Sequence, residues 1–122
     1  MSKAGSLIAV VDDEEPVRKA LSRLLRLAGL KAEIFASGAE FLESLTNNTP
    51  DCVVLDLHMP DTDGFEVESR LRQRGFRVPI VIITGRDMPE DRERMTERGV
   101  TAFLQKPLDG QLLLAAITAV IN

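Results

Sequence analysis

Carboxylate, hydroxyl and amine side chains stand at the ends of the apolar runs in this sequence: Asp12, Asp13, Asp56, Thr84 and Lys106. The first two open a run of four acids that directly follows an apolar segment. Carboxylates gathered in one place repel one another and raise one another's pKa values. A divalent cation removes that conflict, and oxygen ligands without cysteine or a well-placed histidine favour a hard ion such as Mg²⁺.

The same side chains supply the parts of a phosphoryl-transfer site. Mg²⁺ commonly bridges carboxylate and phosphate oxygens. Lys106 adds a positive charge that suits a phosphoryl oxygen, Thr84 adds a hydroxyl donor, and an aspartate can serve as the nucleophile. Metal, cation, hydroxyl donor and carboxylate nucleophile are together the parts of a phosphoryl-transfer site.

Apolar and turn-forming segments alternate along the chain in a way that predicts how these side chains are positioned. Strands are expected near residues 7–11, 31–35, 52–56, 78–85 and 101–107, and helices near 16–28, 38–45, 65–74, 89–98 and 110–121. Strands that alternate with helices predict an α/β fold, in which a parallel sheet carries helices on both faces. Ligand sites in such sheets lie beyond the carboxyl ends of the strands, so the five side chains should converge there.

Local signals fix several helix ends. The segment from Ser37 to Glu40 is a capping-box pattern, and Asp109 is expected to cap the last helix. The fourth helix should be capped by Asp87 or Met88. Glycines at 29, 75 and 99 are expected to end the first, third and fourth helices.

Size and composition bound the possible functions. The 122 residues suffice for one domain, and the net charge of -4 argues against nucleic acid or an anionic membrane as the main partner. Cys52 is the single cysteine, which excludes a disulfide framework and a cysteine-based metal site. No apolar run approaches a membrane span, and the N-terminus is too short and polar for a signal peptide. We therefore expect one cytoplasmic domain over residues 1–122, with no output domain in this chain.

Four segments carry a resemblance to a known family. The stretches VVDDEEPVR, VVLDLHMPDTDGFE, PIVIITG and FLQKPLD resemble the receiver domain of two-component response regulators, and the resemblance runs from Leu7 to Ile121. The details DDEEPVR and ITG are most similar to receivers of the nitrogen-fixation and LuxR-type output class. The resemblance implies a doubly wound, flavodoxin-like (βα)5 fold with strand order 2-1-3-4-5.

The resemblance also implies roles for individual residues. Asp56 would be the phosphoacceptor, charged by a sensor histidine kinase or a phosphotransfer protein. Asp12, Asp13 and Asp56 would hold Mg²⁺ together with the backbone carbonyl of His58. The first helix would form part of the kinase-docking surface.

Signal transmission would depend on residues of the last two strands. The resemblance implies that Thr84 and Lys106 contact the phosphoryl group and that Phe103 changes rotamer on activation. The bond between Lys106 and Pro107 resembles one that the family keeps cis. Leu108 departs from the pattern, because such receivers often have phenylalanine at this position.

Two other functional classes compete with a non-enzymatic switch. A Mg²⁺-dependent phosphohydrolase using an aspartyl-phosphate would need a second acid two residues after the nucleophile, where this chain has His58. A receiver-like scaffold that never accepts phosphate usually lacks site residues that are present here. Glu14 and Glu15 fit an ordinary helix N-terminus, and no chemistry is assigned to them.

The fourth and fifth helices differ in character. Residues 89–98 are almost wholly polar, with Met95 as the one large apolar side chain, which predicts a weakly tethered helix that moves in switching. The last helix is apolar around most of its circumference, so part of it should be exposed, with Leu114 a candidate. An exposed apolar patch favours pairing with a second receiver or docking of an output domain.

Overall fold

Strands and helices alternate throughout the computed structural model, which describes residues 5–121. The elements are β1 Leu7–Val11, α1 Glu15–Leu27, β2 Lys31–Phe35, α2 Gly38–Ser44, β3 Cys52–Asp56, α3 Gly64–Gln73, β4 Ile80–Thr84, α4 Pro89–Glu97, β5 Ala102–Gln105 and α5 Gly110–Ile121. All the strands form one parallel sheet in the order β2-β1-β3-β4-β5. The predicted fold class and strand order are confirmed.

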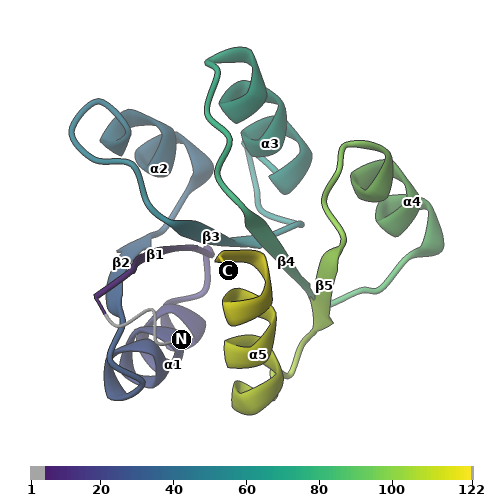
Figure 1. The fold of residues 1–122 in the computed structure, drawn as a ribbon. Helices are drawn as coiled ribbons and strands as arrows, with labels where there is room; N and C mark the ends of the chain where they lie inside the picture. The colour runs from purple at the N-terminus through teal and green to yellow at the C-terminus, as the bar shows by residue number, and fades with distance from the viewer. Residues whose placement is uncertain (1–4, 122) are drawn as a thin grey trace.

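The sheet separates two apolar cores (Figure 1). Helices α1 and α5 cover one face, and α2, α3 and α4 cover the other (Figure 1). Successive strand residues point to opposite faces, so Ile8 and Val10 enter the first core while Ala9 and Val11 enter the second. This double burial explains why β1, β3 and β4 are continuously apolar rather than alternating.

Element ends agree with most of the local signals. Ser37 caps α2 and Asp109 caps α5, each through a side-chain oxygen that accepts hydrogen bonds from backbone N–H groups of the first turn. The N-cap of α4 is Met88, because the Asp87 carboxylate is held instead by Arg92 at 2.9 and 3.1 Å. The expected fourth and fifth strands are shorter than predicted, since a proline flanks each and cannot donate to the sheet.

Helix α4 buries one large apolar side chain, as predicted, but its arginines add contacts that the composition did not predict. Met95 is completely buried. The Arg94 guanidinium lies 3.7 Å from the centre of the Phe65 ring. Arg98 donates hydrogen bonds of 3.0 Å to the Phe65 carbonyl and to the buried Glu68 carboxylate of α3. The helix and its C-cap residue Arg98 are therefore attached to the body of the protein through arginine side chains as well as through Met95.

Helix α5 exposes an apolar side chain, but not the one proposed from the sequence. Leu113 and Ile117 are buried against the sheet. Leu114 is half-buried and packs against the same core, so it does not form part of an exposed apolar patch. Leu112 is 59% exposed and is the large apolar side chain that α5 presents to solvent.

Candidate functional site

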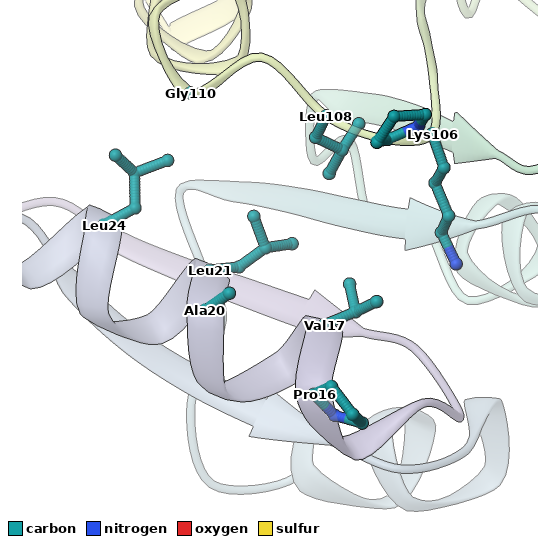
Figure 2. A pocket seen from close by; sticks show the side chains of 9 residues that line it. Pro16, Val17, Ala20, Leu21, Leu24, Lys106, Leu108 and Gly110 are labelled. Carbon is teal, nitrogen blue, oxygen red and sulfur yellow. The ribbon is translucent and has the colours of Figure 1, made fainter.

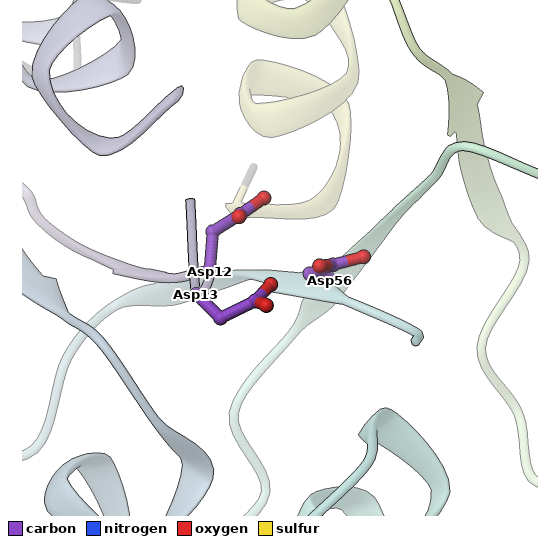
Figure 3. Close-up of side chains that lie close together, drawn as sticks. All are labelled: Asp12, Asp13 and Asp56. Atoms are coloured by element: carbon purple, nitrogen blue, oxygen red, sulfur yellow. The ribbon is translucent and has the colours of Figure 1, made fainter. Parts of the chain in front are cut away.

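The three aspartates predicted to share a site do converge. Asp12 and Asp13 directly follow β1, and Asp56 is the last residue of the neighbouring strand β3. Each offers a carboxylate oxygen, and these oxygens lie within 4.8 Å of one another (Figure 3). Asp12 and Asp56 are buried, while Asp13 is exposed. The cluster thus has a buried floor and one side open to solvent.

The backbone fixes the position of Asp12. Its Oδ1 accepts a hydrogen bond of 2.8 Å from the backbone N–H of Glu14. Its carbonyl accepts a second bond of 2.8 Å from Arg18 Nη1 on the first turns of α1. The β1–α1 turn is therefore closed around the first aspartate of the cluster.

A glycine allows the chain to pass close behind Asp56. The backbone N–H of Gly64 donates a 2.9 Å hydrogen bond to the Leu57 carbonyl. A Cβ atom at Gly64 would lie 2.9 Å from Leu57 Cα and 3.1 Å from the carbonyl oxygen of Asp56. Since neither contact is with a flexible side-chain tip, any larger residue would displace the strand end that carries Asp56.

Lys106 reaches the cluster from the end of β5. Its Nζ lies 2.8 Å from Asp12 Oδ2, 2.8 Å from Glu14 Oε1 and 3.6 Å from Asp56 Oδ2. Burial disfavours the charged amine, but the contacts with Asp12 and Glu14 and the charge of Asp56 outweigh it and raise the pKa of Lys106. Lys106 therefore stays protonated and provides the positive charge of the site.

The residues fit a hard cation. Burial, and then the charge of Asp12, raise the pKa of Asp56 to about 7, although Lys106 and the His58 backbone N–H favour its ionised form. Asp12 Oδ2 forms an ion pair with Lys106 Nζ at 2.8 Å, and this buried oxygen has no hydrogen-bond partner among the described residues. Buried carboxylate oxygens with unsatisfied acceptor capacity are suited to Mg²⁺.

The predicted switch residues lie on the two strands that follow β3 in the sheet, Thr84 on β4 and Phe103 on β5. Thr84, the last residue of β4, is buried, and its Oγ1 donates a 2.7 Å hydrogen bond to the Arg86 carbonyl and accepts one from the Arg86 N–H at 3.1 Å. Phe103 is half-buried in β5, with Arg92 of α4 4.9 Å from its ring centre. The peptide bond between Lys106 and Pro107 is cis.

Two contacts of the site were not foreseen from the sequence. Glu14, interpreted only as a helix-start acid, contacts Lys106, which lowers the pKa of Glu14. The His58 Nε2 atom lies 3.1 Å from Asp91 Oδ2 of α4, so the loop after Asp56 is joined to that helix. The sequence signal was that Glu14 directly follows the predicted ligand Asp13, and that His58 was itself predicted as a ligand, though only through its backbone carbonyl.

Two hollows meet at Lys106. A polar cavity of about 320 Å³ contains Asp56, with Glu14, His58 and Arg86 among its lining residues. An apolar groove of about 330 Å³ lies between α1 and the β5–α5 loop (Figure 2). Because Lys106 lines both, a partner in the groove would lie beside the aspartate cluster.

The family is shown by comparison with known proteins. The family model for the response regulator receiver domain matches residues 8–118. The chain therefore belongs to the receiver domains of two-component response regulators. No helix within residues 5–121 is long and apolar enough to cross a membrane.

Individual relatives agree with this assignment. The chain is 40% identical to the response regulator MprA of a Mycobacterium species over 94% of its own length and 50% of the relative's. It is 34% identical to the response regulator protein TodT of Pseudomonas putida over 100% of its own length and 54% of the relative's. The chain thus spans about half the length of these curated relatives.

Solved structures show the same fold. A response regulator receiver protein from Burkholderia phymatum is 39% identical, with a TM-score of 0.84 over 95% of this chain and 94% of that one. The Vibrio cholerae chemotaxis protein CheY4 is 29% identical, with a TM-score of 0.89 over 96% of this chain and 99% of that one.

The raised pKa of Asp56 predicts a pH dependence of stability. The folded state binds the Asp56 proton more tightly than the unfolded state, so the metal-free protein should lose stability as the pH rises from about 4 to about 7. In Asp56→Asn this decrease in the free energy of unfolding should be smaller by a few kcal/mol, because each unit of pKa difference between the folded and unfolded states corresponds to about 1.4 kcal/mol. Urea denaturation at the two pH values, with a chelator present to remove metal, measures the free energy of unfolding.

The control is Asp61→Asn, the same chemical change at an exposed residue. Asp61 has a φ of 66°, which asparagine also adopts readily. This variant should keep the pH dependence of the wild type. Identical slopes for all three proteins would show that Asp56 does not carry the raised pKa.

The metal fit predicts how Asp13→Ala responds to Mg²⁺. Without metal, removing one of three clustered carboxylates should leave the protein equally or more stable. Mg²⁺ should raise the melting temperature of the wild type by mass action, and raise that of the variant much less. Thermal melts with and without Mg²⁺ test this, with Glu15→Ala as the control for loss of one exposed negative charge. An equal Mg²⁺ shift in all three proteins would exclude the cluster as the metal site.

Proposed function

We propose that this receiver domain is a phosphorylation-controlled switch whose phosphoacceptor is Asp56, with Asp12, Asp13, Asp56 and the His58 carbonyl holding Mg²⁺. The observation that carries the proposal is the buried Asp56 carboxylate beside two further acids and the Lys106 amine. When bound, Mg²⁺ supplies charge neutralisation for the carboxylates and for an incoming phosphoryl group.

The chemical step uses the Asp56 carboxylate as nucleophile. A carboxylate oxygen attacks the phosphorus of a phosphohistidine on a sensor kinase or phosphotransfer protein. The O–P bond forms as the P–N bond breaks, and the imidazole nitrogen leaves with the electron pair and takes up a proton. Lys106, already 3.6 Å from Asp56 Oδ2, is close enough to bind a phosphoryl oxygen. Hydrolysis of the acyl phosphate resets the domain, so the chain acts as a switch rather than as an enzyme that turns over a substrate.

Transmission of the signal runs through β4 and β5. In the present structure the Thr84 hydroxyl is bonded to the backbone of Arg86, two residues along its own loop. A phosphoryl group on Asp56 offers this hydroxyl a more strongly charged acceptor. The loop must rearrange when Thr84 turns inward, and Phe103 then moves toward the space that is vacated. Phosphorylation thus biases a two-state element near α4 and β5.

The donor and downstream partners follow from two surfaces. The groove between α1 and the β5–α5 loop adjoins Lys106 and suits the docking of a phosphodonor protein in the cytoplasm. The exposed Leu112 of α5 suits a second copy of the receiver, or an output domain, as the downstream partner. Residues 1–122 would form a single receiver domain that binds neither membrane nor nucleic acid directly.

The first test is chemical. Incubation with acetyl phosphate and Mg²⁺ should add one labile phosphoryl group, about 80 Da, measured by intact mass. Asp56→Asn should keep the fold and lose the adduct, because an amide is a poor nucleophile toward phosphorus. Asp61→Asn should be phosphorylated like the wild type. Continuous turnover of donor beyond the rate of adduct hydrolysis would favour a phosphohydrolase, and absence of any adduct would favour a scaffold.

The second test concerns α5. Light scattering should show a larger mass for the wild type with acetyl phosphate and Mg²⁺ than without. Leu112→Glu should remove that increase, because a charge cannot be buried in an apolar interface without a partner. Leu27→Glu is the matched control, since Leu27 is an exposed leucine of α1. A wild type that remains monomeric in both states would exclude the dimer through α5.

A further inference from the structure

Lys106 is shared among three acids, one of which the proposed phosphoryl transfer does not use. Asp12 and Asp56 belong to the buried cluster. Glu14 contributes the third carboxylate from the N-cap of α1, and its side chain is 58% exposed. It lies in the lining of the polar cavity that contains Asp56. The cavity therefore has an additional negative charge next to its one amine.

The distances show that two acids hold the amine, Asp12 and Glu14, each with an oxygen 2.8 Å from Lys106 Nζ. Lys106 Nζ is 2.8 Å from Glu14 Oε1, and the two atoms form a hydrogen bond. The same nitrogen is 3.6 Å from Asp56 Oδ2, beyond hydrogen-bond range. Glu14 thus accepts a hydrogen bond from Lys106, and both residues line the cavity that an anionic ligand would enter.

A carboxylate and a phosphoryl group are alternative ligands for the same ammonium. Both present anionic oxygens, and an ammonium group has only three N–H donors. Asp12 is buried beside Lys106 and fixed by its own backbone contacts, so it cannot leave. Glu14 is largely exposed and can rotate into water at little cost. Of the two acids that hold Lys106, Glu14 is the one a phosphoryl group can replace.

We propose that Glu14 is a positioning residue that competes with the incoming phosphoryl group for Lys106 and so slows the phosphorylation of Asp56. This inference rests on the proposed function. It adds no chemical step, because Glu14 contacts Lys106 and not the reacting atoms. In the phosphorylated protein Glu14 is displaced into solvent, so its influence is confined to formation of the acyl phosphate.

The neighbouring residue supplies a matched control. Glu15 carries the same charge one position later, but its carboxylate pairs with Lys19 at 3.4 Å, on the exposed surface of α1. The Glu14 side chain makes no capping hydrogen bond to α1. Glu14→Gln and Glu15→Gln therefore remove one charge each from the same turn, and only the first removes an ion pair with Lys106.

The experiment measures the second-order rate constant for phosphorylation by acetyl phosphate in excess Mg²⁺, by intact mass, and the rate of hydrolysis after donor removal. Glu14→Gln should raise the phosphorylation rate constant about two- to fivefold, the range that exposed ion pairs reach. Glu15→Gln should stay within about 1.5-fold of the wild type, since screened charges act weakly at a distance. Hydrolysis should be unchanged in both. A general distortion of the site would alter both rates.

A second pair of variants tests whether the effect passes through Lys106. Lys106→Met should slow phosphorylation, and adding Glu14→Gln to it should give no more gain than adding Glu15→Gln. Thermal melts confirm that each variant is folded. Equal rate constants for Glu14→Gln and Glu15→Gln would overturn the inference, as would a gain that persists without Lys106. A folded wild type that takes up no phosphoryl group would instead overturn the proposed function, and this inference with it.

Discussion

Repulsion among the carboxylates of Asp12, Asp13 and Asp56 governs the energetics of the sheet edge at which β1 and β3 end. Two of the three are shielded from water, and their oxygens lie within 4.8 Å of one another. Like charges at this spacing oppose folding unless positive charge is close. Lys106 supplies part of that charge from the far edge of the sheet. A bound cation, or a new ligand on Asp56, would therefore change the interactions at the ends of β1, β3 and β5 together.

The sheet that creates this balance was predictable because its signals are local. Continuous apolar runs identified β1, β3 and β4, since a strand buried on both faces carries no polar alternation. The parallel arrangement then brought the residues after Val11 and Leu55 to one edge. Helix ends such as Ser37 and Asp109 were also predictable, because a cap depends on residues within one turn.

Two particular contacts between distant side chains were not predictable. Glu14 and Lys106 are separated by 92 positions, and the predicted convergence of strand ends did not show that the Glu14 side chain, rather than a neighbouring acid, would pair with the amine. The link from His58 to Asp91 depends on where the β3–α3 loop passes α4, which periodicity does not define. Helical spacing likewise could not decide whether Leu112 or Leu114 faces solvent, because both lie in an uninterrupted apolar segment.

The attachment of α4 has a consequence for the behaviour of the protein in concentrated solution. Met95 is the large apolar side chain that α4 buries, and the remaining contacts are made by groups such as Arg94 and Arg98 that are readily hydrated. A helix held in this way can shift against α3 while uncovering little apolar area, provided that Met95 stays in the core. Movement of α4 should therefore cause little aggregation. A change that exposed the apolar core beneath α5 should cause more.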